Sequence, residues 1–321
     1  TLATHAESVR AIVANAGNAN AGLGKMETVW ARELIECGAI AAGVSADNVL
    51  SASTGVIGTP FPIERIRSGM HEASASLAPD NWQAAANAIR TTDTFAKWSS
   101  AQVNIDGHNY TLTGISKGSG MIHPNMATML AFVATDAPIA ATELQAMLKR
   151  VANRSFNCIS VDGCMSTNDM VTVMANGYAK NTSISKPGKD FNQFCEALNY
   201  ICLDLAKKIV LDGEGATKFI EIHCVGAKTN KQAKQVGMTI ANSNLVKTAA
   251  YGKNPNWGRI AAAVGSLGIK SVTEQTLQIK FSSFTKKEIS ITVDLSIGDA
   301  HSKVYTCDLS LDYVRINGKY N

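Results

Sequence analysis

The sequence predicts a mixed α/β fold in which helices are layered on sheets, with a smaller β-rich unit at the carboxyl end. Short apolar runs with strand character alternate with helical segments along the first two thirds of the chain. From about residue 226 the pattern changes to alternating strands. The 321 residues are 45% hydrophobic and 17% charged, which allows a substantial buried core. We therefore expect a larger domain at 1–225 and a smaller one at 226–321, with mixed layers rather than a doubly wound nucleotide-binding sheet.

The first ninety residues alternate between strand, loop and helix signals. The apolar run V-R-A-I-V-A predicts a strand at 9–14, and the loop N-A-G-N-A-N-A-G-L-G follows it. Met26, Trp30 and Leu34 recur at helical spacing, so a helix is expected over 26–44. The remaining expected elements are a strand at 49–52, a loop S-T-G-V-I-G at 53–58, and helices at about 62–76 and 81–89.

The middle of the chain contains a hairpin and the most regular helix. Asp106-Gly107 is a strong turn dipeptide, so strands are expected on either side of it, at 97–105 and 110–115. A loop at 117–125, a strand at 128–133 and a helix at 142–153 capped by Thr142 should follow. The helix over 191–211 is predicted by apolar residues that step by three and four, and Gly213 should end it. Those residues are Phe191, Phe194, Leu198, Ile201, Leu205 and Ile209.

The last hundred residues predict a short helix and three strands. The helix is expected at 258–264, and the strands at 276–281, 288–295 and 303–309. These elements define the predicted β-rich domain.

Composition argues against several function classes. The net charge is +4, the basic residues are scattered and aromatic residues make up 6%, so we expect no nucleic-acid partner. The seven cysteines include no C-x-x-C pair and no zinc-ligand pattern, which favours a reducing intracellular setting and no metal. No run of 18 apolar residues occurs, so no membrane-spanning helix is predicted. The chain starts without methionine and soon enters a strand, so we expect that a preceding segment is missing.

The segment K-G-S-G-M-I-H-P-N-M-A-T-M-L, residues 117–130, is where we expect the chemistry. A loop rich in glycine and proline leads into an apolar strand that opens with Thr128. Threonine is common in strands because it is β-branched, which is the structural interpretation. In the catalytic interpretation, the Thr128 hydroxyl attacks the carbonyl of Ala127 and the resulting ester hydrolyses. The freed α-amino group, with a pKa near 8, could then act as base for its own hydroxyl.

This segment resembles the self-cleavage segment of the ornithine acetyltransferases of arginine biosynthesis, also called glutamate N-acetyltransferases. The resemblance covers essentially the whole chain, and the matching motifs occur in the family's order. They are G-N-A-N-A at 17–21, S-T-G-V-I-G at 53–58, T-T-D-T at 91–94, S-T-N-D at 166–169, D-G-E-G-A-T-K at 212–218, N-P-N-W-G-R-I at 254–260 and D-Y-V-R-I-N at 312–317. The fold implied is an N-terminal-nucleophile-like sandwich of sheets and helices.

The resemblance implies three catalytic residues. Cleavage would occur between Ala127 and Thr128, and Thr128 would be the nucleophile that carries the acetyl group. Thr54 and Gly55 would form the oxyanion hole, since a hydroxyl and a backbone N–H suit a developing negative charge. From the residues alone, the S-T-G-V-I-G loop is a tight turn or a weak phosphate loop that lacks the lysine of a P-loop.

The resemblance also implies substrate contacts at Lys117, Thr91, Glu214 and Asn317, besides Thr128. The Lys117 charge suits the α-carboxylate of an amino acid, and the Glu214 carboxylate suits its ammonium group. Without the resemblance, Lys117 would be an exposed loop lysine, Thr91 a helix terminus and Glu214 part of a solvated turn. Other matching residues are interpreted as structural or subunit contacts, namely Lys247, Trp257 and Arg259.

The chain departs from the family pattern at several places. Where the family has D-T-S-T-N-D-T, this chain has C-M-S-T-N-D-M, with Cys164, Met165 and Met170. The family's opening segment and its final substrate-binding threonine do not occur in the given sequence, and we expect both to be missing termini rather than evolved losses. His123 occupies a variable position in the cleavage loop, where it either aids the acyl shift or is a bystander.

The implied reaction transfers acetyl from N-acetyl-L-ornithine to L-glutamate through acetyl-Thr128. No metal or organic cofactor is expected, and use of acetyl-CoA as a second donor is left open. The cleaved chains should stay together and pair into a heterotetramer, in the cytoplasm or, in a eukaryote, in mitochondria. Two alternatives remain: a related N-terminal-nucleophile aminopeptidase that delivers the acyl group to water, and a non-catalytic amino-acid-binding paralogue.

Overall fold

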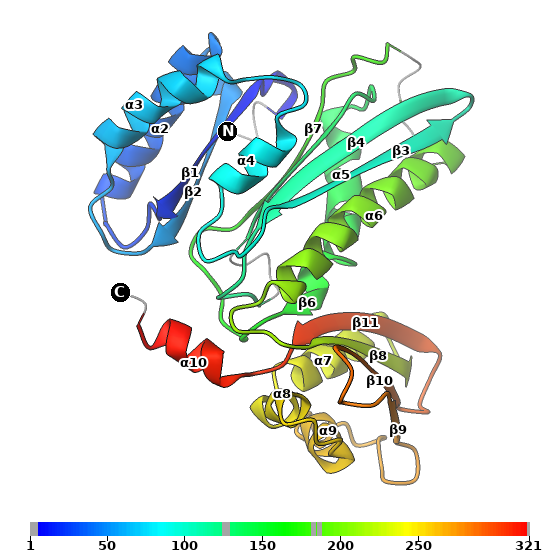
Figure 1. The fold of residues 1–321 in the computed structure, drawn as a ribbon. Helices are drawn as coiled ribbons and strands as arrows, with labels where there is room; N and C mark the ends of the chain where they lie inside the picture. Colours follow the sequence, from blue (N-terminus) through cyan, green and yellow to red (C-terminus); the bar gives the residue numbers. More distant parts are fainter. Residues whose placement is uncertain (1–5, 124–128, 181–183, 185–187, 320–321) are drawn as a thin grey trace.

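The computed structural model describes residues 6–123, 129–180, 184 and 188–319. Within these residues the chain forms three sheets, with helices on their faces (Figure 1). The mixed α/β class predicted from the sequence is confirmed.

The central sheet has the order β3-β4-β5-β7. Its strands are β3 (Lys97–Ile105), β4 (His108–Lys117), β5 (Leu130–Thr135) and β7 (Met170–Ala175). β3 and β5 run antiparallel to β4 between them, and β7 runs parallel to β5. Lys117, the last residue of β4, lies opposite Leu130, the first residue of β5. The two strands that flank the predicted cleavage segment are therefore direct neighbours.

Alternating side chains of the central sheet bury both of its faces. Leu112 and Val133 face the core formed with α5 (Ala141–Ala152) and the long helix α6 (Lys189–Leu211). Gly114 gives α6 room, because a Cβ there would lie 3.1 Å from a methyl carbon of Leu205. Ile115 and Phe132 face the opposite way, toward the first sheet.

The first sheet is the parallel pair β1 (Ala11–Asn18) and β2 (Val49–Val56). Its outer face packs on α2 (Met26–Ala42) and α3 (Ile63–Ala75) through a separate apolar cluster. Its inner face and α4 (Trp82–Ala88) share a core with the central sheet. Helices, sheet, sheet and helices therefore follow one another across this part of the molecule (Figure 1).

A third sheet with the order β6-β11-β8-β10-β9 forms the lower part in Figure 1. It contains β6 (Ile159–Ser160), β8 (Phe219–Ala227), β9 (Gln278–Phe281), β10 (Glu288–Asp294) and β11 (Ala300–Cys307). Its core is shared with α7 (Asn230–Ala241), α8 (Asn244–Tyr251) and α9 (Trp257–Gly265). From β11 the chain returns toward the first part through α10 (Leu311–Asn317).

Several sequence expectations were wrong in detail. β1 and β2 extend to Asn18 and Val56, so the expected loops at 15–24 and 53–58 begin as paired strand. Thr142 does not cap α5, because Ala140 is the N-cap residue and the Thr142 hydroxyl donates to Glu143. The carboxyl-terminal region contains α7, α8 and α10 besides its strands. The expected boundary between 225 and 226 falls inside β8, and the division into two domains stays a prediction.

Candidate active site

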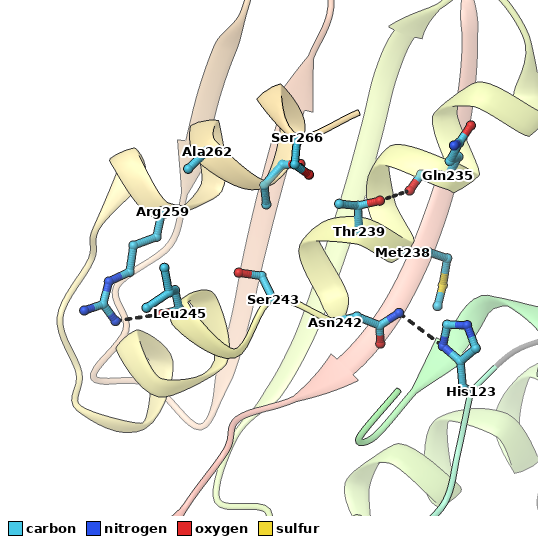
Figure 2. Close-up of a pocket in the computed structure, with 11 residues that line it drawn as sticks. His123, Gln235, Met238, Thr239, Asn242, Ser243, Leu245, Arg259, Ala262 and Ser266 are labelled. Atoms are coloured by element: carbon cyan, nitrogen blue, oxygen red, sulfur yellow. Dashed lines mark hydrogen bonds between the residues drawn. The ribbon is translucent and has the colours of Figure 1, made fainter. Parts of the chain in front are cut away.

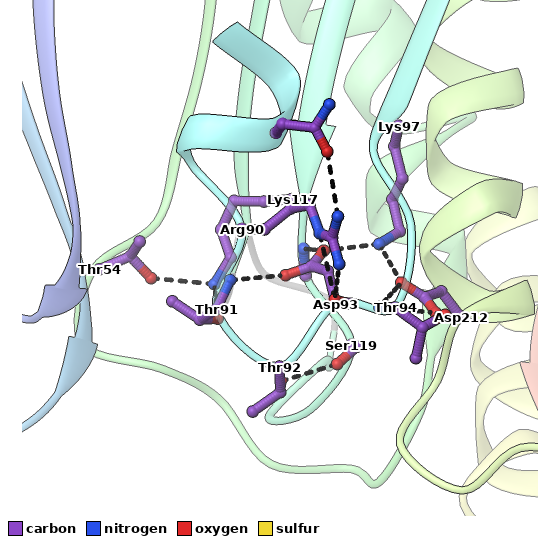
Figure 3. A network of polar contacts seen from close by, with 12 residues as sticks. Thr54, Arg90, Thr91, Thr92, Asp93, Thr94, Lys97, Lys117, Ser119 and Asp212 are labelled. Carbon is purple, nitrogen blue, oxygen red and sulfur yellow. Dashed lines mark hydrogen bonds and ion pairs between the residues drawn. The ribbon is translucent and has the colours of Figure 1, made fainter. Parts of the chain in front are cut away.

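Lys117 brings together three of the residues predicted for the site. It ends β4 and is only 4% exposed. Its Nζ donates to Thr54 Oγ1 on β2 at 3.1 Å and to Thr91 Oγ1 at 2.9 Å (Figure 3). The two hydroxyls and the ammonium group therefore converge between the first sheet and the central sheet.

The environment of Lys117 makes its charge sensitive to its neighbours. Burial lowers the pKa of the Lys117 ammonium, and the nearby Lys97 lowers it further. The Asp93, Asp169 and Glu214 carboxylates oppose this effect and raise the pKa of Lys117. A buried ammonium with two neutral hydroxyl partners is a strong donor for an incoming carboxylate.

Gly55 allows an unusually close approach of β1 and β2. It lies opposite Gly17 in the ladder and has φ +132°. A Cβ on Gly55 would lie 2.2 Å from the carbonyl carbon of Gly17 and 2.3 Å from its oxygen. Only glycine fits this position without moving the backbone. The neighbouring Thr54 side chain is thereby held beside Lys117, while its oxyanion role stays a prediction.

A buried charged cluster lies behind the site. Lys97 Nζ contacts Asp93 Oδ1 and Asp212 Oδ2, each at 2.5 Å (Figure 3). Asp93 also accepts the Gly118 N–H at 2.7 Å and the Thr91 N–H at 3.1 Å. Burial alone would raise the pKa of Asp93, but Lys97, the Gly118 N–H and Lys117 together hold it below its ordinary value. The sequence did not single out Lys97, Asp93 or Asp212 for the site.

Glu214 and Asn317 lie together, as their shared predicted role requires. Asn317 Nδ2 at the end of α10 donates to Glu214 Oε2 at 2.9 Å. The Glu214 N–H donates to the Ser119 carbonyl at 2.9 Å, and a Cβ on Gly120 would collide with the Glu214 carboxylate. Glu214 is thus packed against the loop that continues from Lys117. Their contact with substrate stays a prediction.

Ala127 and Thr128 lie outside the described residues, but their flanks are described. The Met129 N–H donates to Asp169 Oδ1 at 2.7 Å, and the Met170 N–H donates to the Met129 carbonyl at 3.0 Å. On the other side of the gap, Asp162 accepts the N–H groups of Met121 and Ile122. Two carboxylates therefore hold the chain on either side of the predicted cleavage point.

Asp169 is a second residue whose part in the site the sequence did not reveal. Burial raises the pKa of its carboxyl to about 7, although the Met129 N–H and Lys117 lower it. The motif S-T-N-D contained the residue, but only the fold places it against Met129. Its protonation state should change near neutral pH.

We expect Asp169 to give the protein a pH-dependent stability. Its folded-state pKa lies above the unfolded value near 4, so between about pH 4 and 7 the folded chain holds a proton that the unfolded chain has released. The Asp169 contribution to the free energy of unfolding should therefore fall as pH rises through this window and be level above it. Denaturant unfolding of the wild type and of Asp169→Asn, at several pH values, measures this. If the free energy of unfolding depended on pH in the same way in the two proteins, the raised pKa of Asp169 would be contradicted.

The residues that depart from the family pattern lie beside this region. Cys164 is an exposed residue with a free thiol, and its backbone N–H donates to Asp162 Oδ1 at 3.2 Å. Burial and Asp162 raise the pKa of the Cys164 thiol, which favours its neutral form. Met165 is exposed, and Met170 pairs with Leu130 at the start of β7. None of the three blocks the Lys117 contacts described above.

Residues interpreted as structural make internal contacts or lie on the surface. Lys247 is buried and its Nζ donates to Thr306 Oγ1 at 3.0 Å and to the Cys307 carbonyl. The Arg259 guanidinium donates to the Leu245 carbonyl at 2.7 Å, and the Trp257 side chain is exposed.

A separate cleft of about 580 Å³ lies among α7, α8 and α9 (Figure 2). His123 reaches its edge, where its Nδ1 lies 3.1 Å from Asn242 Nδ2. None of the six described residues predicted for the site lines this cleft. We therefore place the candidate active site at Lys117.

Metal and membrane features were searched over the same part of the chain. Among the residues described, no group of three or more His, Cys, Asp or Glu side chains is placed to hold a metal ion. None of the described helices is long and apolar enough to cross a membrane.

Comparison with known proteins identifies the family. The model of the ArgJ family matches residues 1–321. The chain belongs to the ArgJ family. Proteins of Psychrobacter arcticus and Geobacter sulfurreducens named arginine biosynthesis bifunctional protein ArgJ are each 45% identical to it. The matches cover 98% and 99% of this chain and 82% and 86% of those relatives.

A solved ArgJ structure supports the fold. The crystal structure of arginine biosynthesis bifunctional protein argJ from Bacillus halodurans is 42% identical, with a TM-score of 0.57. The match covers 60% of this chain and 100% of that one.

Proposed function

We propose that this protein transfers acetyl from N-acetyl-L-ornithine to L-glutamate through an acetyl-Thr128 intermediate. The observation that supports this most strongly is the convergence of Lys117, Thr54 and Thr91 at the end of β4, opposite the strand that follows Thr128. In an ArgJ-family chain, this arrangement offers a carboxylate-binding ammonium beside the predicted oxyanion donors.

The proposed maturation is a self-cleavage. The Thr128 hydroxyl attacks the Ala127 carbonyl, and the acyl group moves from nitrogen to oxygen, which breaks the peptide bond and frees the α-amino group of Thr128. Water then hydrolyses the ester, which releases the Ala127 carboxylate and restores the Thr128 hydroxyl. A chain that starts at Thr128 would have 194 of the 321 residues, or 60%. The solved Bacillus halodurans chain, which matches over its whole length, covers the same share of this chain, and this agreement supports the proposal.

The proposed catalytic cycle has two steps. In the first, the Thr128 hydroxyl attacks the acetyl carbonyl of N-acetyl-L-ornithine, while its α-amino group takes the hydroxyl proton and passes it to the leaving amine. Thr54 and the Gly55 N–H would stabilise the oxyanion. In the second, the amine of L-glutamate attacks the acetyl ester and the bond from Thr128 Oγ to the acetyl carbon breaks. The α-amino group passes the proton of the attacking amine to Thr128 Oγ, and N-acetylglutamate leaves.

Substrate binding uses the charged residues around this centre. Lys117 would bind the α-carboxylate, with Thr91 beside it, and Glu214 would bind the α-ammonium of glutamate, held by Asn317. No metal or organic cofactor takes part in the proposed cycle. We further propose acetyl-CoA as a second donor, because the relatives are named bifunctional.

The proposal extends to assembly and compartment. Two cleaved chains would pair into a heterotetramer, as the resemblance to the family implies, and the bacterial relatives favour the cytoplasm. Mass measurement of the native assembly, beside that of the denatured chains, checks the heterotetramer.

Acetyl-labelled N-acetyl-L-ornithine tests the reaction. With L-glutamate present, label should appear in N-acetylglutamate as ornithine is released in equal amount. Without an acceptor, label should stop at one acetyl group on each chain that begins with Thr128. Continued release of acetate without glutamate would favour the aminopeptidase alternative. Binding of the substrates with no transfer would favour the paralogue.

A further inference from the structure

We propose that the buried cluster Asp93, Lys97 and Asp212 is a positioning unit that sets the place and the charge of the Lys117 ammonium for a substrate carboxylate. This inference rests on the proposed function of Lys117. None of the three cluster residues was expected in the site, and none is proposed to touch substrate.

The cluster is fully desolvated. The side chains of Asp93 and Lys97 are 0% exposed and that of Asp212 is 2% exposed. Taking three charges out of water costs free energy, and apolar side chains of similar size often stabilise a core as well or better. A contribution to stability is therefore a weak explanation for this cluster.

The hydrogen bonds of the cluster end on the segments that carry the substrate-binding residues. The Asp93 carboxylate accepts hydrogen bonds from the Gly118 N–H and the Thr91 N–H. The Gly118 N–H belongs to the peptide bond that follows Lys117. Asp212 holds the Thr94 N–H at 3.0 Å and the Thr94 hydroxyl. Lys97 joins the two carboxylates, so it links the segment 91–94 to the end of α6.

The same contacts reach toward Glu214. Asp212 is two residues before Glu214, whose N–H donates to the Ser119 carbonyl. Ser119 Oγ in turn lies 2.8 Å from Thr92 Oγ1 (Figure 3). Segments 91–94, 117–119 and 212–214 are therefore connected to one another by hydrogen bonds, and Lys97 joins the two carboxylates among them. Displacing Lys97 should loosen all three segments together.

The charges of the cluster matter as much as its contacts. One lysine and two aspartates carry a net charge of −1, which the Lys117 ammonium balances. The charged groups that act on Lys117 are Asp93 on the segment before β3, Lys97 on β3, Asp169 before β7 and Glu214 after α6. Because burial lowers the pKa of Lys117, it depends on these carboxylates to stay protonated. A neutral Lys117 would bind a carboxylate poorly.

Asp93→Asn is the variant that tests both effects. It keeps the side-chain shape but removes the charge that raises the pKa of Lys117 the most, and it turns one acceptor into a donor. We expect KM for both substrates to rise about tenfold or more, with kcat changed less, and the alkaline limb of kcat/KM to move to lower pH. Asp212→Asn keeps the Asp93 contacts to Gly118 and Thr91. It should therefore also move the alkaline limb of kcat/KM to lower pH, but by a smaller amount than Asp93→Asn.

Lys247→Met is the matched control. Lys247 is also a buried lysine, 2% exposed, but its partners Thr306 and Cys307 lie in the third sheet. Its loss should lower thermal stability without changing KM or the pH profile. A change in KM or in the pH profile that Lys247→Met shares with Asp93→Asn would come from a general effect on folding. Only the part of the change that is larger in Asp93→Asn reports on the site.

A second readout is independent of turnover. Competitive labelling of amines with a small reagent across a pH series, followed by mass spectrometry of the peptide that contains Lys117, gives the midpoint at which Lys117 loses its proton. We expect a lower midpoint in Asp93→Asn than in the wild type, and no change in Lys247→Met. If Asp93→Asn does not fold, Asp212→Asn takes its place in the same comparison. An unchanged midpoint, with a rise in KM no larger than in Lys247→Met, would overturn the inference. A shifted midpoint in a protein that transfers no acetyl would support the cluster and refute the proposed function instead.

Discussion

A Thr128→Ala variant is expected to remain one uncleaved chain and to lose acetyl transfer by about 10³-fold or more. Alanine has no hydroxyl to attack the Ala127 carbonyl, so the α-amino group that acts as base is never freed. The same change removes the atom that carries the acetyl group. Intact mass under denaturing conditions measures the first effect, and labelled acetyl transfer measures the second.

Thr128→Ser is the matched control for that variant. Serine keeps a hydroxyl at the same position, so cleavage and transfer should persist at a reduced rate. Two fragments from Thr128→Ala, or one uncut chain from the wild type, would refute the self-processing mechanism. One uncut wild-type chain would move the interpretation to the binding paralogue.

Gly55→Ala is expected to destabilise the protein by about 3–5 kcal/mol and to abolish most of the activity. A Cβ would collide with the Gly17 backbone, so β1 and β2 must separate or their ladder must shift. Either movement takes Thr54 away from Lys117. Denaturant unfolding and steady-state rates on the same preparation measure the two effects.

Gly17→Ala is the control that distinguishes the steric clash at Gly55 from the backbone strain of a non-glycine residue at positive φ. Gly17 lies opposite Gly55 and has φ +107°, but a Cβ there would meet no atom within 4 Å. We expect it to cost only the backbone strain, about 1–3 kcal/mol. Equal losses of stability in the two variants would show that the close approach at Gly55 is not what requires glycine.

The sequence predicted elements well where one periodicity extended over a long segment. The six apolar residues expected on one side of the helix at 191–211 are all buried on α6. The hairpin at Asp106-Gly107 is confirmed because the turn type and the alternation agree. The strand ends in G-N-A-N-A and S-T-G-V-I-G were missed, because glycine and asparagine usually mark loops, whereas here they pair closely between two strands.

The helices missed in the carboxyl-terminal region did have start signals. Thr229 and Ser243 cap α7 and α8 by accepting the N–H groups of Gln232 and Val246, and Ser310 caps α10. The alternating pattern of the three predicted strands at 276–281, 288–295 and 303–309 was stronger than these start signals, so the region was interpreted as β-rich.

The candidate site could be predicted only where residues belong to long motifs. Lys117, Thr54 and Thr91 came from motifs and are joined in the structure by two hydrogen bonds. Lys97 and Asp212 are 115 positions apart, and no local pattern relates them. Such a contact depends on the path of α6 back to β3. The same holds for Asp169, which gains its role from pairing of β5 with β7.

The order of strands in the central sheet has a consequence for how the two cleaved pieces could exist. β3 and β4 precede the proposed cut, whereas β5 and β7 follow it, and six residue pairs join β4 to β5. Each piece alone would expose an open sheet edge, and the first would also lack α6, which covers β3 and β4. The two pieces would therefore be obligate complements. Genes split at this point should yield product only when both halves are made together, and a mixture of separately refolded halves should aggregate instead of reconstituting.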